Sequence, residues 1–503
     1  MTTADTILAI DSGTSRTKAA IFDLAGNPLG IASQDMIVLH PFEGASEMDM
    51  HAVWDAVCTV CKELAQRFPE EWKNLRGVAV TAQGDGLWPL DADGKPLGNA
   101  MLWNDTRVKR LELSNEDEIT RFGIDNALCP LFAGAVPMLM RWMQDFEPQR
   151  FEKLAHVIHC KDWLVYNLTG EIVTDRTDAS TAMLNILTGK YEFGLLDMME
   201  IPREKANAFP VFVDSSTVVG HSGGSAFQAS AIPAGLPVIA GALDVVAATY
   251  GSGARQAGDA VSILGTTLSN QVIIDASQVS HKDVAGSTLG FITPNTFMRI
   301  LASTNGAGTI DWAREALSPG QSYDELEKEL NEKIPAGSEG LFFLPYLNGE
   351  RAPFRETRAT ASFAGLNIRH NRLHMLRAVY EGLAYGMRDC HAHLPQGDSP
   401  INLCGGASKS SFLSQLCADM LGRPTRSIPK REFGLLGMAM AWMAGMGIPL
   451  PETADTAGSK LYTPRKEFTA IYDDGYEIYK DLRQTSQPFW QQRDEFIIRL
   501  DQE

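Results

Sequence analysis

The chain has 503 residues, of which 44% are hydrophobic and 21% charged, a balance typical of a folded globular protein. This composition excludes global disorder, collagen and an extended coiled coil, and no apolar run is long enough to span a membrane. Lys and Arg number 44 against 62 Asp and Glu, so the formal net charge is −18. A chain this acidic has no general attraction for nucleic acid or anionic lipid, so neither is expected as a partner. A small anionic ligand would need a local site made of backbone amides or a metal ion.

Two features of the sequence predict a cytoplasmic location. The N-terminal sequence MTTADTILAIDSGTSRTK lacks a basic region before its apolar stretch, so it is more typical of a first strand than of a signal peptide. The seven cysteines are an odd number and are scattered along the chain, which suits thiols in a reducing compartment.

Two small groups of metal-binding residue types also occur. Cys58 and Cys61 form a CxxC inside a helical pattern, without a second pair, and we interpret them as packing residues rather than metal or redox ligands. His156, His159 and Cys160 cluster in AHVIHCKDW, where apolar neighbours favour the edge of a strand or helix. Neither group therefore predicts a metal centre.

The elements predicted for the first part of the chain alternate between strands and helices. Segment 6–14 is an apolar run that ends in Asp-Ser-Gly-Thr, and 16–36 has the pattern of a hairpin around Ala-Gly-Asn-Pro. Apolar residues at helical spacing predict a helix over 50–68, and 76–86 predicts a strand that breaks into a glycine-containing turn. This alternation indicates an α/β chain.

The second half repeats part of this pattern. Segments 234–246 and 259–275 predict apolar strands interrupted at Gly, Asp and Thr. AIDSGTSRTKAAIFD and SILGTTLSNQVIID both have the pattern of a strand, a Gly-Thr turn and a second strand, and they lie half the chain apart. We therefore expect two halves of like architecture with a cleft between them, divided near the Gly-rich segment 251–259.

The turn after the first strand is a candidate phosphate-binding loop. In Asp11-Ser12-Gly13-Thr14-Ser15, glycine lets the backbone approach a ligand, and consecutive N–H groups with hydroxyls form an anion-binding nest. Asp11 is suited to hold Mg²⁺ through water, and Lys18 adds a positive charge nearby. A plain β-turn is the alternative interpretation.

Two further turns in the second half have related features. Gly265-Thr266-Thr267 is a short loop of the same kind, and two such loops could hold one polyphosphate. The sequence contains no GxxxxGK[ST], which excludes a P-loop, and no GxGxxG after a strand, which argues against a dinucleotide site. Asp244 ends an apolar strand, where it suits both a general base and the N-cap of the helix expected after it.

Carboxylates beside aromatic residues indicate a site for a neutral polyol. Asp85 lies between two glycines shortly before Trp88, and Trp103 and Asp105 lie together in LWNDTR. A carboxylate accepts hydrogen bonds from hydroxyls while a ring covers a C–H face, although core packing is the alternative for each ring. Gly405-Gly406-Ala407 precedes a predicted helix, and its small residues allow a ring or a phosphate to approach, or form a simple helix-entry turn.

Taken together, these pieces resemble the FGGY carbohydrate kinases, of the actin-like, ribonuclease-H-like ATPase superfamily. The matching stretches occur in family order and span residues 9 to 424. They are AIDSGTSRTKAAIFD, VTAQGDGLWPLD, LWNDTR, DWLVYNLTGEIVTDRTDAS, AGALDVV, ILGTT, FFLPYLNGERAP, RAVYEGLAYG and LCGGASKSSFLSQLCADMLGRP. The resemblance implies an α/β fold of two ribonuclease-H-like domains around a central cleft. The first domain, 1–250, would bind the sugar, and the second, 251–503, the nucleotide.

The resemblance also implies roles for the matching residues. Asp11 corresponds to the family's acid near Mg²⁺, and Asp244 to the base that takes the proton from the substrate hydroxyl, also near the metal. Gly84, Asp85 and Trp103 occupy substrate-contact positions, together with Asp244. The positions implied to contact nucleotide are Gly13, Thr14, Ser15, Gly265, Thr266, Asp311, Gly405, Gly406, Ala407 and Ser410.

Departures from the family pattern narrow the expected substrate. Glycerol kinases carry Arg-Glu and D-xylulose kinases Met-His where this chain has Gly84-Asp85, so the sequence is more similar to the erythritol kinase and L-xylulose kinase branches. Asp85 would repel an acidic sugar, and AQGDGLW contains no Lys or Arg to pair with one. We therefore expect a neutral polyol or ketose of four or five carbons. Residues 432–437 also depart from the family's small-residue run, at the expected edge of the nucleotide pocket.

The predicted reaction is phosphoryl transfer from ATP, with Mg²⁺, to a hydroxyl of this sugar, with domain closure to exclude water. Two alternatives stay open, a kinase for a hexulose or aldonic acid and a non-catalytic sugar or nucleotide sensor on the same fold. Dimers are common among similar proteins, so the resemblance leaves a homodimer open, and the sequence does not specify an interface.

Overall fold

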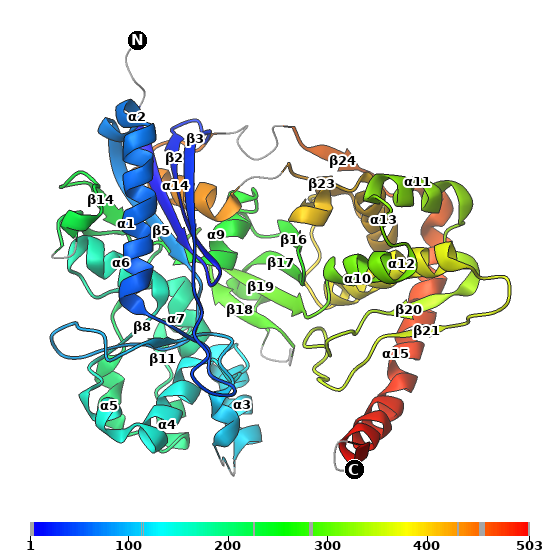
Figure 1. Ribbon diagram of the computed structural model, residues 1–503, viewed down its shortest axis with the longest axis horizontal. Coiled ribbons are helices and arrows are strands. Elements are labelled where there is room, and N and C mark those ends of the chain that lie inside the picture. Colours follow the sequence, from blue (N-terminus) through cyan, green and yellow to red (C-terminus); the bar gives the residue numbers. More distant parts are fainter. Residues whose placement is uncertain are drawn as a thin grey trace. The chain divides into compact units, whose positions relative to one another are not determined.

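The computed structural model describes residues 5–111, 113, 115–224, 227–280, 285–429, 432–451 and 458–500 (Figure 1). The chain divides into two compact units. Unit 1 consists of Met1–Arg255, Asp275–Met298 and Arg431–Asp455, and unit 2 of Gln256–Ile274, Arg299–Lys430 and Thr456–Glu503. Each unit is therefore assembled from segments that lie far apart in the sequence.

Unit 1 contains a large sheet, several short strands and the helices packed on them. Its strands are β1 (Thr6–Ser12), β2 (Arg16–Asp23), β3 (Pro28–Asp35), β4 (Glu47–Met48), β5 (Leu75–Ala82), β6 (Trp88–Leu90), β7 (Ala100–Met101), β8 (His156–Ile158), β9 (Thr174–Asp175), β10 (Leu184–Asn185), β11 (Lys190–Tyr191), β12 (Phe212–Val213), β13 (Val218–His221), β14 (Pro237–Ile239), β15 (Ala242–Leu243) and β18 (Ser287–Gly290). Its helices are α1 (Met50–Arg67), α2 (Pro69–Lys73), η1 (Arg107–Arg110), α3 (Glu116–Phe122), the π-helix η2 (Gly123–Ala127), α4 (Val136–Phe146), α5 (Pro148–Lys153), α6 (Cys160–Thr169), α7 (Arg176–Ala182), α8 (Gly194–Met198), η3 (Arg203–Ala208), η4 (Phe227–Ala229), α9 (Asp244–Gly251), η5 (Ala276–Gln278) and α14 (Phe433–Gly445).

Unit 2 has its own large sheet and a set of longer helices. The strands that lie mostly in it are β16 (Ala260–Leu264), β17 (Leu268–Asp275), β19 (Thr296–Ser303), β20 (Phe342–Leu344), β21 (Ser362–Ala364), β22 (Ile401–Cys404), β23 (Thr425–Ser427) and β24 (Lys460–Tyr462). Its helices are α10 (Gly308–Leu317), α11 (Tyr323–Lys333), η6 (Ser338–Gly340), α12 (Arg372–Ala392), η7 (Gly406–Lys409), α13 (Ser411–Leu421) and α15 (Lys466–Leu500).

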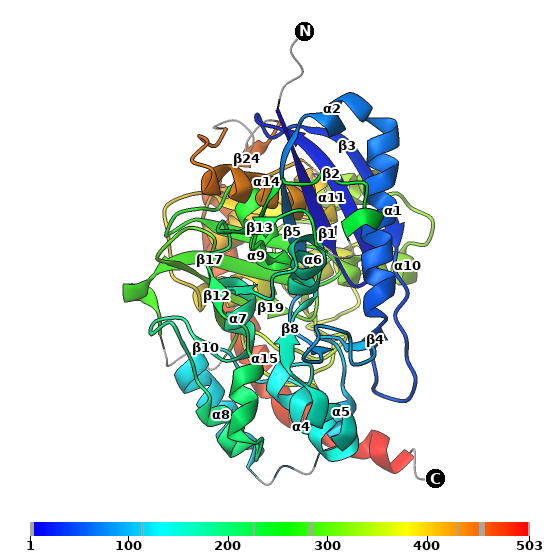
Figure 2. The same ribbon diagram turned by 90° about the vertical axis from the view of Figure 1, so that its left-hand side faces the viewer.

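The large sheet of unit 1 has the strand order β13-β14-β5-β1-β2-β3, and β15 also pairs with β5. Its central strand β1 is antiparallel to β2 and parallel to β5. Both faces of β1 are buried, because alternate residues meet different helices. Leu8 and Ile10 belong to the core formed with α1, whereas the face that carries Gly77 of β5 meets Trp442 of α14. Figure 2 shows the sheet with α1 along one face and α14 along the other.

This topology gathers polar residues at one edge of the unit 1 sheet. Strands β1 and β15 both run parallel to β5, with Asp11 and Ala242 each opposite Thr81. The carboxyl ends of parallel strands meet at the same edge, where ligand sites of open α/β sheets lie. The turn after β1, the turn after β5 and Asp244 after β15 consequently lie at one edge.

Unit 2 repeats this arrangement. The large sheet contains, in order, β19-β17-β16-β22-β23-β24, with β16 antiparallel to β17 and parallel to β22. The β16–β17 hairpin with its parallel neighbour corresponds to the β1–β2 hairpin with β5. Because Ile263 pairs with Cys404, the turns that begin at Gly265 and Gly405 lie side by side.

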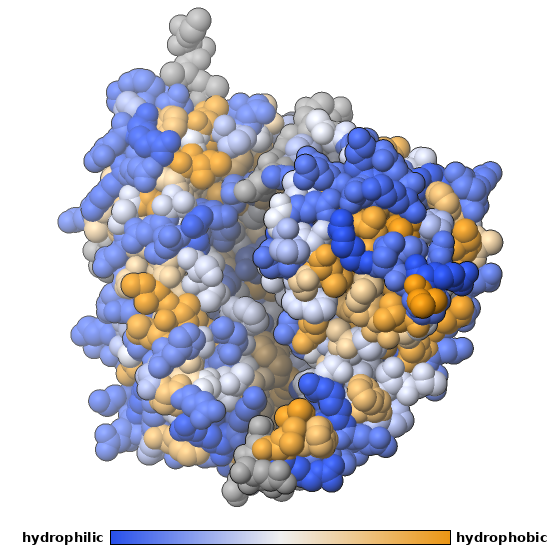
Figure 3. All heavy atoms as spheres, turned by 45° about the vertical axis from the view of Figure 1, so that its right-hand side comes forward, coloured by the Kyte–Doolittle hydropathy of each residue, from blue (hydrophilic) through white to orange (hydrophobic). Residues whose placement is uncertain are grey.

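The expected α/β fold with two sheet-containing parts is confirmed. The helix predicted over 50–68 is α1, and it begins where the Asp49 carboxylate accepts hydrogen bonds from the N–H groups of His51 and Ala52. All seven cysteines are buried thiols. Cys58 and Cys61 lie on the buried face of α1 and pack in the core, as interpreted from the sequence. Within the described part of the chain, none of the helices combines the length and the apolar content needed to cross a bilayer. Hydrophilic residues predominate on the face drawn in Figure 3.

Glycines allow α14 to pack directly on the backbone of α9. A Cβ on Gly437 would lie 2.0 Å from the carbonyl oxygen of Ala247, and a Cβ on Gly251 would lie 2.0 Å from that of Phe433. Real Cβ atoms do not approach backbone this closely, so any larger residue would separate the two helices. Helix α14 is thereby fixed between α9 and the sheet.

We predict that Gly437→Ala destabilises the fold by about 1–3 kcal/mol, because a methyl group forced into backbone contact outweighs the better helix propensity of alanine. Gly386→Ala in α12 is the matched control, since its Cβ would meet only ordinary contacts at 3.6 and 3.7 Å. Denaturant unfolding followed by circular dichroism measures both. A Gly437→Ala protein as stable as the control would contradict the close packing.

Candidate active site

Three carboxylates lie at the ligand-binding edge of unit 1. Asp11 is near the end of β1, Asp85 is in the turn after β5, and Asp244 is the first residue of α9; all three are half-buried. Desolvation, followed by repulsion from Asp11, raises the pKa of Asp244 to about 7. Desolvation also raises the pKa of Asp11 to about 6, against the opposing effect of Lys18. The edge therefore carries crowded carboxylates that take up a proton near neutral pH.

The first candidate phosphate loop is joined to the predicted sugar-binding residues. The Thr14 hydroxyl donates a 2.7 Å hydrogen bond to the side chain of Gln83, next to Gly84. Nε1 of Trp103 donates to the Thr14 hydroxyl at 3.0 Å, and Trp103 is 41% exposed. The Gly13 N–H donates to the Arg16 carbonyl, so the N–H groups of Thr14 and Ser15 form the tip of the turn. The structure thus brings together residues that the sequence assigned to two different ligands.

The turn that contains Gly84 and Asp85 needs its glycines. A Cβ on Gly84 would lie 1.9 Å from Cδ1 of Leu243 and 3.1 Å from Oδ1 of Asp178. Asp85 itself has φ of 55°, a left-handed conformation in which Asp is among the more tolerated residues. The backbone at Gly84 therefore packs closely against a second carboxylate, that of the buried Asp178.

A buried charged cluster next to this turn was missed by the sequence analysis. Lys161 is fully buried at the start of α6, and its Nζ lies 2.6 Å from Asp162, 3.3 Å from Asp175 and 3.4 Å from Asp178. Desolvation favours the neutral amine, but the three carboxylates outweigh it and raise the pKa of Lys161. The Lys161 ammonium in turn holds the pKa of Asp162 down to about 2, against desolvation. The sequence signal that could have revealed this cluster is a lysine next to an aspartate, Lys161-Asp162, in an otherwise largely apolar stretch.

Asp105 has a structural role, because its carboxylate is buried and bonded within the protein. Its carboxylate binds the Arg107 guanidinium at 2.8–2.9 Å and accepts a 2.8 Å hydrogen bond from the Ser46 N–H. Arg107 also binds Glu47 at 2.6 Å, and both Asp105 and Arg107 are buried. The interpretation of Asp105 as a polyol-binding acid was therefore wrong, because burial assigns its carboxylate to an arginine.

The segment 432–437 lies beside Asp11 in unit 1. Lys18 Nζ binds Glu432 at 2.6 Å, and a Cβ on Gly434 would lie 3.4 Å from Oδ2 of Asp11. The positive charge of Lys18 is thus shared between Glu432 and Asp11. This segment, which departs from the family pattern, therefore borders Asp11, the carboxylate expected to lie near a metal ion.

In unit 2 the second candidate phosphate loop is held against the start of α10. The N–H of Ala307 donates to the carbonyl of Gly265 at 2.8 Å, and that of Gly308 donates to Thr266 at 3.4 Å. Gly405 has φ of 89°, and a Cβ there would lie 2.6 Å from the carbonyl oxygen of Leu264. A Cβ on Gly406, by contrast, would meet no described atom within 4 Å. The two turns at the ends of β16 and β22 therefore form one glycine-rich surface with an open side.

Two of the predicted nucleotide contacts are already engaged within unit 2. Asp311 accepts a hydrogen bond from the Tyr323 hydroxyl. Ser410 caps α13 by accepting from the Leu413 N–H at 2.9 Å, and its hydroxyl donates to Glu327 at 2.8 Å. Both residues lie on helices that border the glycine-rich turns, but their side chains would have to exchange partners to contact a ligand.

A magnesium ion is the metal that these residues would fit. Among the described residues, no three His, Cys, Asp or Glu side chains form a metal-binding group. Asp11 and Asp244 nevertheless repel each other, and Mg²⁺ is usually held by one or two carboxylates, with water and substrate phosphates as its other ligands. The donor chemistry of this pair therefore suits a cation that arrives with a phosphate substrate.

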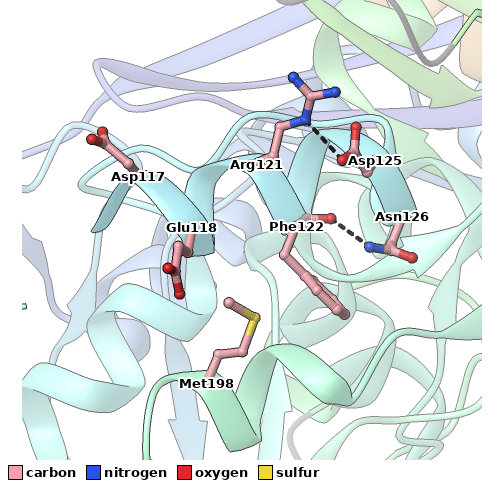
Figure 4. Close-up of a pocket in the computed structure, with 7 residues that line it drawn as sticks. All are labelled: Asp117, Glu118, Arg121, Phe122, Asp125, Asn126 and Met198. Carbon is pink, nitrogen blue, oxygen red and sulfur yellow. Dashed lines mark hydrogen bonds and ion pairs between the residues drawn. The ribbon is translucent and has the colours of Figure 1, made fainter. Parts of the chain in front are cut away.

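A separate surface hollow lies away from these residues. Its volume is about 410 Å³, and it is formed by α3, η2 and α8 of unit 1 (Figure 4). The residues that line it are Asp117, Glu118, Arg121, Phe122, Asp125, Asn126 and Met198. None of the predicted site residues contributes to it, and the cation among its described lining residues, Arg121, is already paired with Asp125 at 2.8 Å.

Comparison with known proteins agrees with this geometry. Residues 6–251 match the N-terminal domain, and residues 260–446 the C-terminal domain, of the FGGY family of carbohydrate kinases. An erythritol kinase of Brucella abortus is 26% identical over 97% of this chain and 97% of its own. An L-xylulose/3-keto-L-gulonate kinase of Escherichia coli is 27% identical over 96% and 97%. The crystal structure of a xylulose kinase from Rhodospirillum rubrum superimposes with a TM-score of 0.87, at 25% identity, over 97% of this chain and 100% of that one.

The α/β fold with two sheet-containing units, together with these matches, defines a carbohydrate kinase. The chain belongs to the FGGY family of carbohydrate kinases. The resemblance inferred from the sequence is thereby confirmed, as is the assignment of the chain as a carbohydrate kinase.

We predict that Lys161→Met destabilises the protein by about 3–5 kcal/mol, because three buried carboxylates lose their cation. The loss should be larger at pH 8 than at pH 5, since protonation of the carboxylates relieves their repulsion. Lys190→Met, at an exposed position on β11, is the matched control and should change stability little. Urea unfolding at both pH values measures the difference. Equal stability of the two variants would show that Lys161 does not compensate the cluster.

Proposed function

We propose that the protein transfers the γ-phosphate of ATP to a hydroxyl of a small neutral sugar or polyol of four or five carbons, such as erythritol or L-xylulose. The observation that carries this proposal is the crowding of Asp244, Asp11 and Asp85 at one strand edge, beside the half-exposed ring of Trp103. This set supplies a base, a partner for a cation, and an acceptor and an apolar surface for a polyol.

In this reaction Asp244 orients the substrate hydroxyl and accepts its proton. A pKa of about 7 suits this role, since a general base is most effective when its pKa lies near the working pH. Mg²⁺, held through water by Asp11 with a share from Asp244, would neutralise charge on the transferring phosphate. The residues we propose to hold the phosphates are Gly13, Thr14, Ser15, Gly265 and Thr266, largely through backbone N–H groups.

The nucleotide is proposed to bind mainly to the C-terminal part of the chain, 251–503, and the sugar to 1–250. Gly405, Gly406 and Ala407 would border the adenosine, because the turn has an open side at Gly406. Asp311 and Ser410 complete this set only if they exchange their present bonds to Tyr323 and Glu327.

The substrate class rests on Gly84, Asp85 and Trp103. Asp85 Oδ1 is buried and has no hydrogen-bond partner among the described residues, so it is available to a substrate hydroxyl. A carboxylate at this place opposes an acidic sugar. The relatives named above as erythritol kinase and L-xylulose/3-keto-L-gulonate kinase support a polyol or ketose. A cytoplasmic location is proposed with it, supported by the seven buried thiols and by ATP as co-substrate.

The test is ADP release with ATP and Mg²⁺ across neutral C3 to C6 polyols and ketoses, with two aldonic acids included. Stimulation by a C4 polyol or an L-ketopentose is the expected result. Stimulation by an acid alone would keep the kinase and overturn the neutral substrate class. No stimulation, with nucleotide still bound in equilibrium dialysis, would favour the sensor.

We predict that Asp244→Asn lowers kcat by about 10²–10⁴-fold, since the amide cannot accept the hydroxyl proton. The melting temperature should not fall, because the neutral amide removes the repulsion from Asp11. A coupled ADP assay at saturating sugar and ATP measures kcat. Retention of most of the wild-type rate would exclude Asp244 as the base.

We predict that Asp85→Ala raises KM for the sugar by about 5–100-fold while KM for ATP stays within a factor of two, because only hydroxyl contacts are lost. Asp93→Ala, an exposed acid in the following turn, is the control. Initial rates against both substrates give the two constants. A change in KM for ATP alone would move Asp85 out of the sugar site.

A further inference from the structure

A buried histidine stands against the cluster beneath the Gly84 turn. His159 directly precedes α6 and is 4% exposed. Its backbone N–H donates a 3.0 Å hydrogen bond to Oδ2 of Asp162. Its ring atom Nδ1 lies 3.4 Å from the same carboxylate oxygen. The next residue, Cys160, contacts the Ser12 carbonyl at 3.8 Å through its thiol. The ring is thus anchored next to the strand end that carries Asp11.

Three side chains of this group have buried polar atoms that form no hydrogen bond within the described residues. They are both ring nitrogens of His159, both carboxylate oxygens of Asp178 and Oδ1 of Asp85. Two of these atoms have a charged partner at 3.4 Å, His159 Nδ1 beside Asp162 and Asp178 Oδ2 beside Lys161, which leaves His159 Nε2, Asp178 Oδ1 and Asp85 Oδ1 with none in the described part of the chain. Buried polar groups are almost always hydrogen-bonded, because an unmet donor or acceptor costs about 1–3 kcal/mol. Their concentration in one place indicates that a polar ligand completes them.

The three groups act on one another electrostatically and on the proposed base. Asp178 and Asp85 both act on the His159 ring, and both also raise the pKa of Asp244. Asp178 Oδ1 would lie 3.1 Å from a Cβ on Gly84, so it lies directly under the turn that holds Asp85. The group is therefore close to the proposed site of phosphoryl transfer.

We propose that His159 and Asp178 are specificity-determining residues that bind hydroxyl or carbonyl oxygens of the sugar, together with Asp85. This inference rests on the proposed function and extends it to two residues that nothing above assigns to substrate. His159 supplies the donor and the two carboxylates supply acceptors, the combination that a compound with adjacent hydroxyls or a ketose requires.

The surroundings of His159 favour its role as a donor. Because Nδ1 faces Asp162, the second ring nitrogen, Nε2, is the one left for a ligand. Desolvation favours the neutral ring, but the carboxylates of Asp178, Asp162 and Asp85 outweigh it and raise the pKa of His159. Lys161, the other cation of the cluster, is already engaged by three carboxylates at 2.6, 3.3 and 3.4 Å, so its ammonium is not available to a ligand.

The charges of the cluster also select against acidic sugars. Lys161 faces Asp162, Asp175 and Asp178, and Asp85 adds a fourth carboxyl group, so four acids stand against the two cations Lys161 and His159. A substrate carboxylate would enter this field against repulsion, whereas a neutral polyol would not. Specificity would thus come from a repulsive element as well as an attractive one.

The experiment compares His159→Leu and His159→Asn with His156→Gln, using the sugar and aldonic acids that stimulate wild-type ADP release. His159→Leu should raise KM for the sugar about 10-fold or more, with kcat changed less than about threefold, because a substrate contact is lost. His159→Asn keeps an N–H donor and an N-cap residue and should recover most of the affinity. His156, half-buried on β8 and influenced by Asp91, is the matched control and should leave both constants unchanged.

Asp178→Asn tests the same proposal if the leucine variant does not fold. The amide keeps the size of the side chain, and Lys161 keeps Asp162 and Asp175 as partners. Its kcat/KM for an aldonic acid, relative to the neutral sugar, should rise about 10-fold. Equilibrium dialysis of the sugar without ATP gives the same comparison for binding alone.

The outcomes separate this inference from the function on which it rests. An active wild type with an unchanged KM in His159→Leu and an unchanged acid-to-neutral ratio in Asp178→Asn overturns this inference alone. A fall in melting temperature and kcat without a change in KM also overturns it, since that is the signature of a structural role. Absence of sugar-stimulated turnover in the wild type overturns the proposed function, and this inference with it.

Discussion

The functional edge of unit 1 depends on one constraint, the mutual repulsion of carboxylates that are partly withdrawn from water. Asp11, Asp85 and Asp244 are held near one another, and Asp178 lies beneath them. Like charges this close cannot all be ionised in a low-dielectric setting, so the pKa values of several rise toward neutrality. Lys161 is the buried cation that compensates Asp178 together with Asp162 and Asp175, while Lys18 and His159 act on Asp11 and Asp85.

The same constraint connects stability with chemistry. A set of acids arranged only for stability would each have a cation, as Asp105 has Arg107. Asp244 and Asp11 instead repel each other, which costs stability and leaves them ready to receive a proton or a cation. The close packing of α14 on α9 through Gly437 and Gly251 fixes the position of α14. Since Gly434 of α14 lies against Asp11, this packing also fixes one side of the functional edge.

Much of the fold could be predicted from the sequence, because its signals are local. The hairpin at 16–36, the helix at 50–68 and the paired Gly-Thr turns follow from hydrophobic spacing and turn residues. Bringing Asp11, Asp85 and Asp244 to one edge follows from parallel pairing, which the alternation of strands and helices anticipates.

The rest could not be predicted, because it depends on contacts between distant segments. Lys161 and His159 looked like ordinary residues of a helix edge, and only the approach of Asp175 and Asp178 gives them a role. Asp105 had the same local appearance as Asp85, and the difference between them is the burial of one beside Arg107. Side-chain environment, which a sequence pattern does not contain, decides both cases.

The origin of α14 also bears on how the chain is made. This helix covers one face of the first sheet, yet it is encoded about 350 residues after β5, close to the C-terminus. During synthesis on a ribosome, β1 and β5 emerge long before the helix that completes their core, so their apolar face stays open while unit 2 is being translated. The core of nascent unit 1 therefore stays incomplete until α14 has been synthesised, and a fragment that ends at residue 255 would lack α14 altogether.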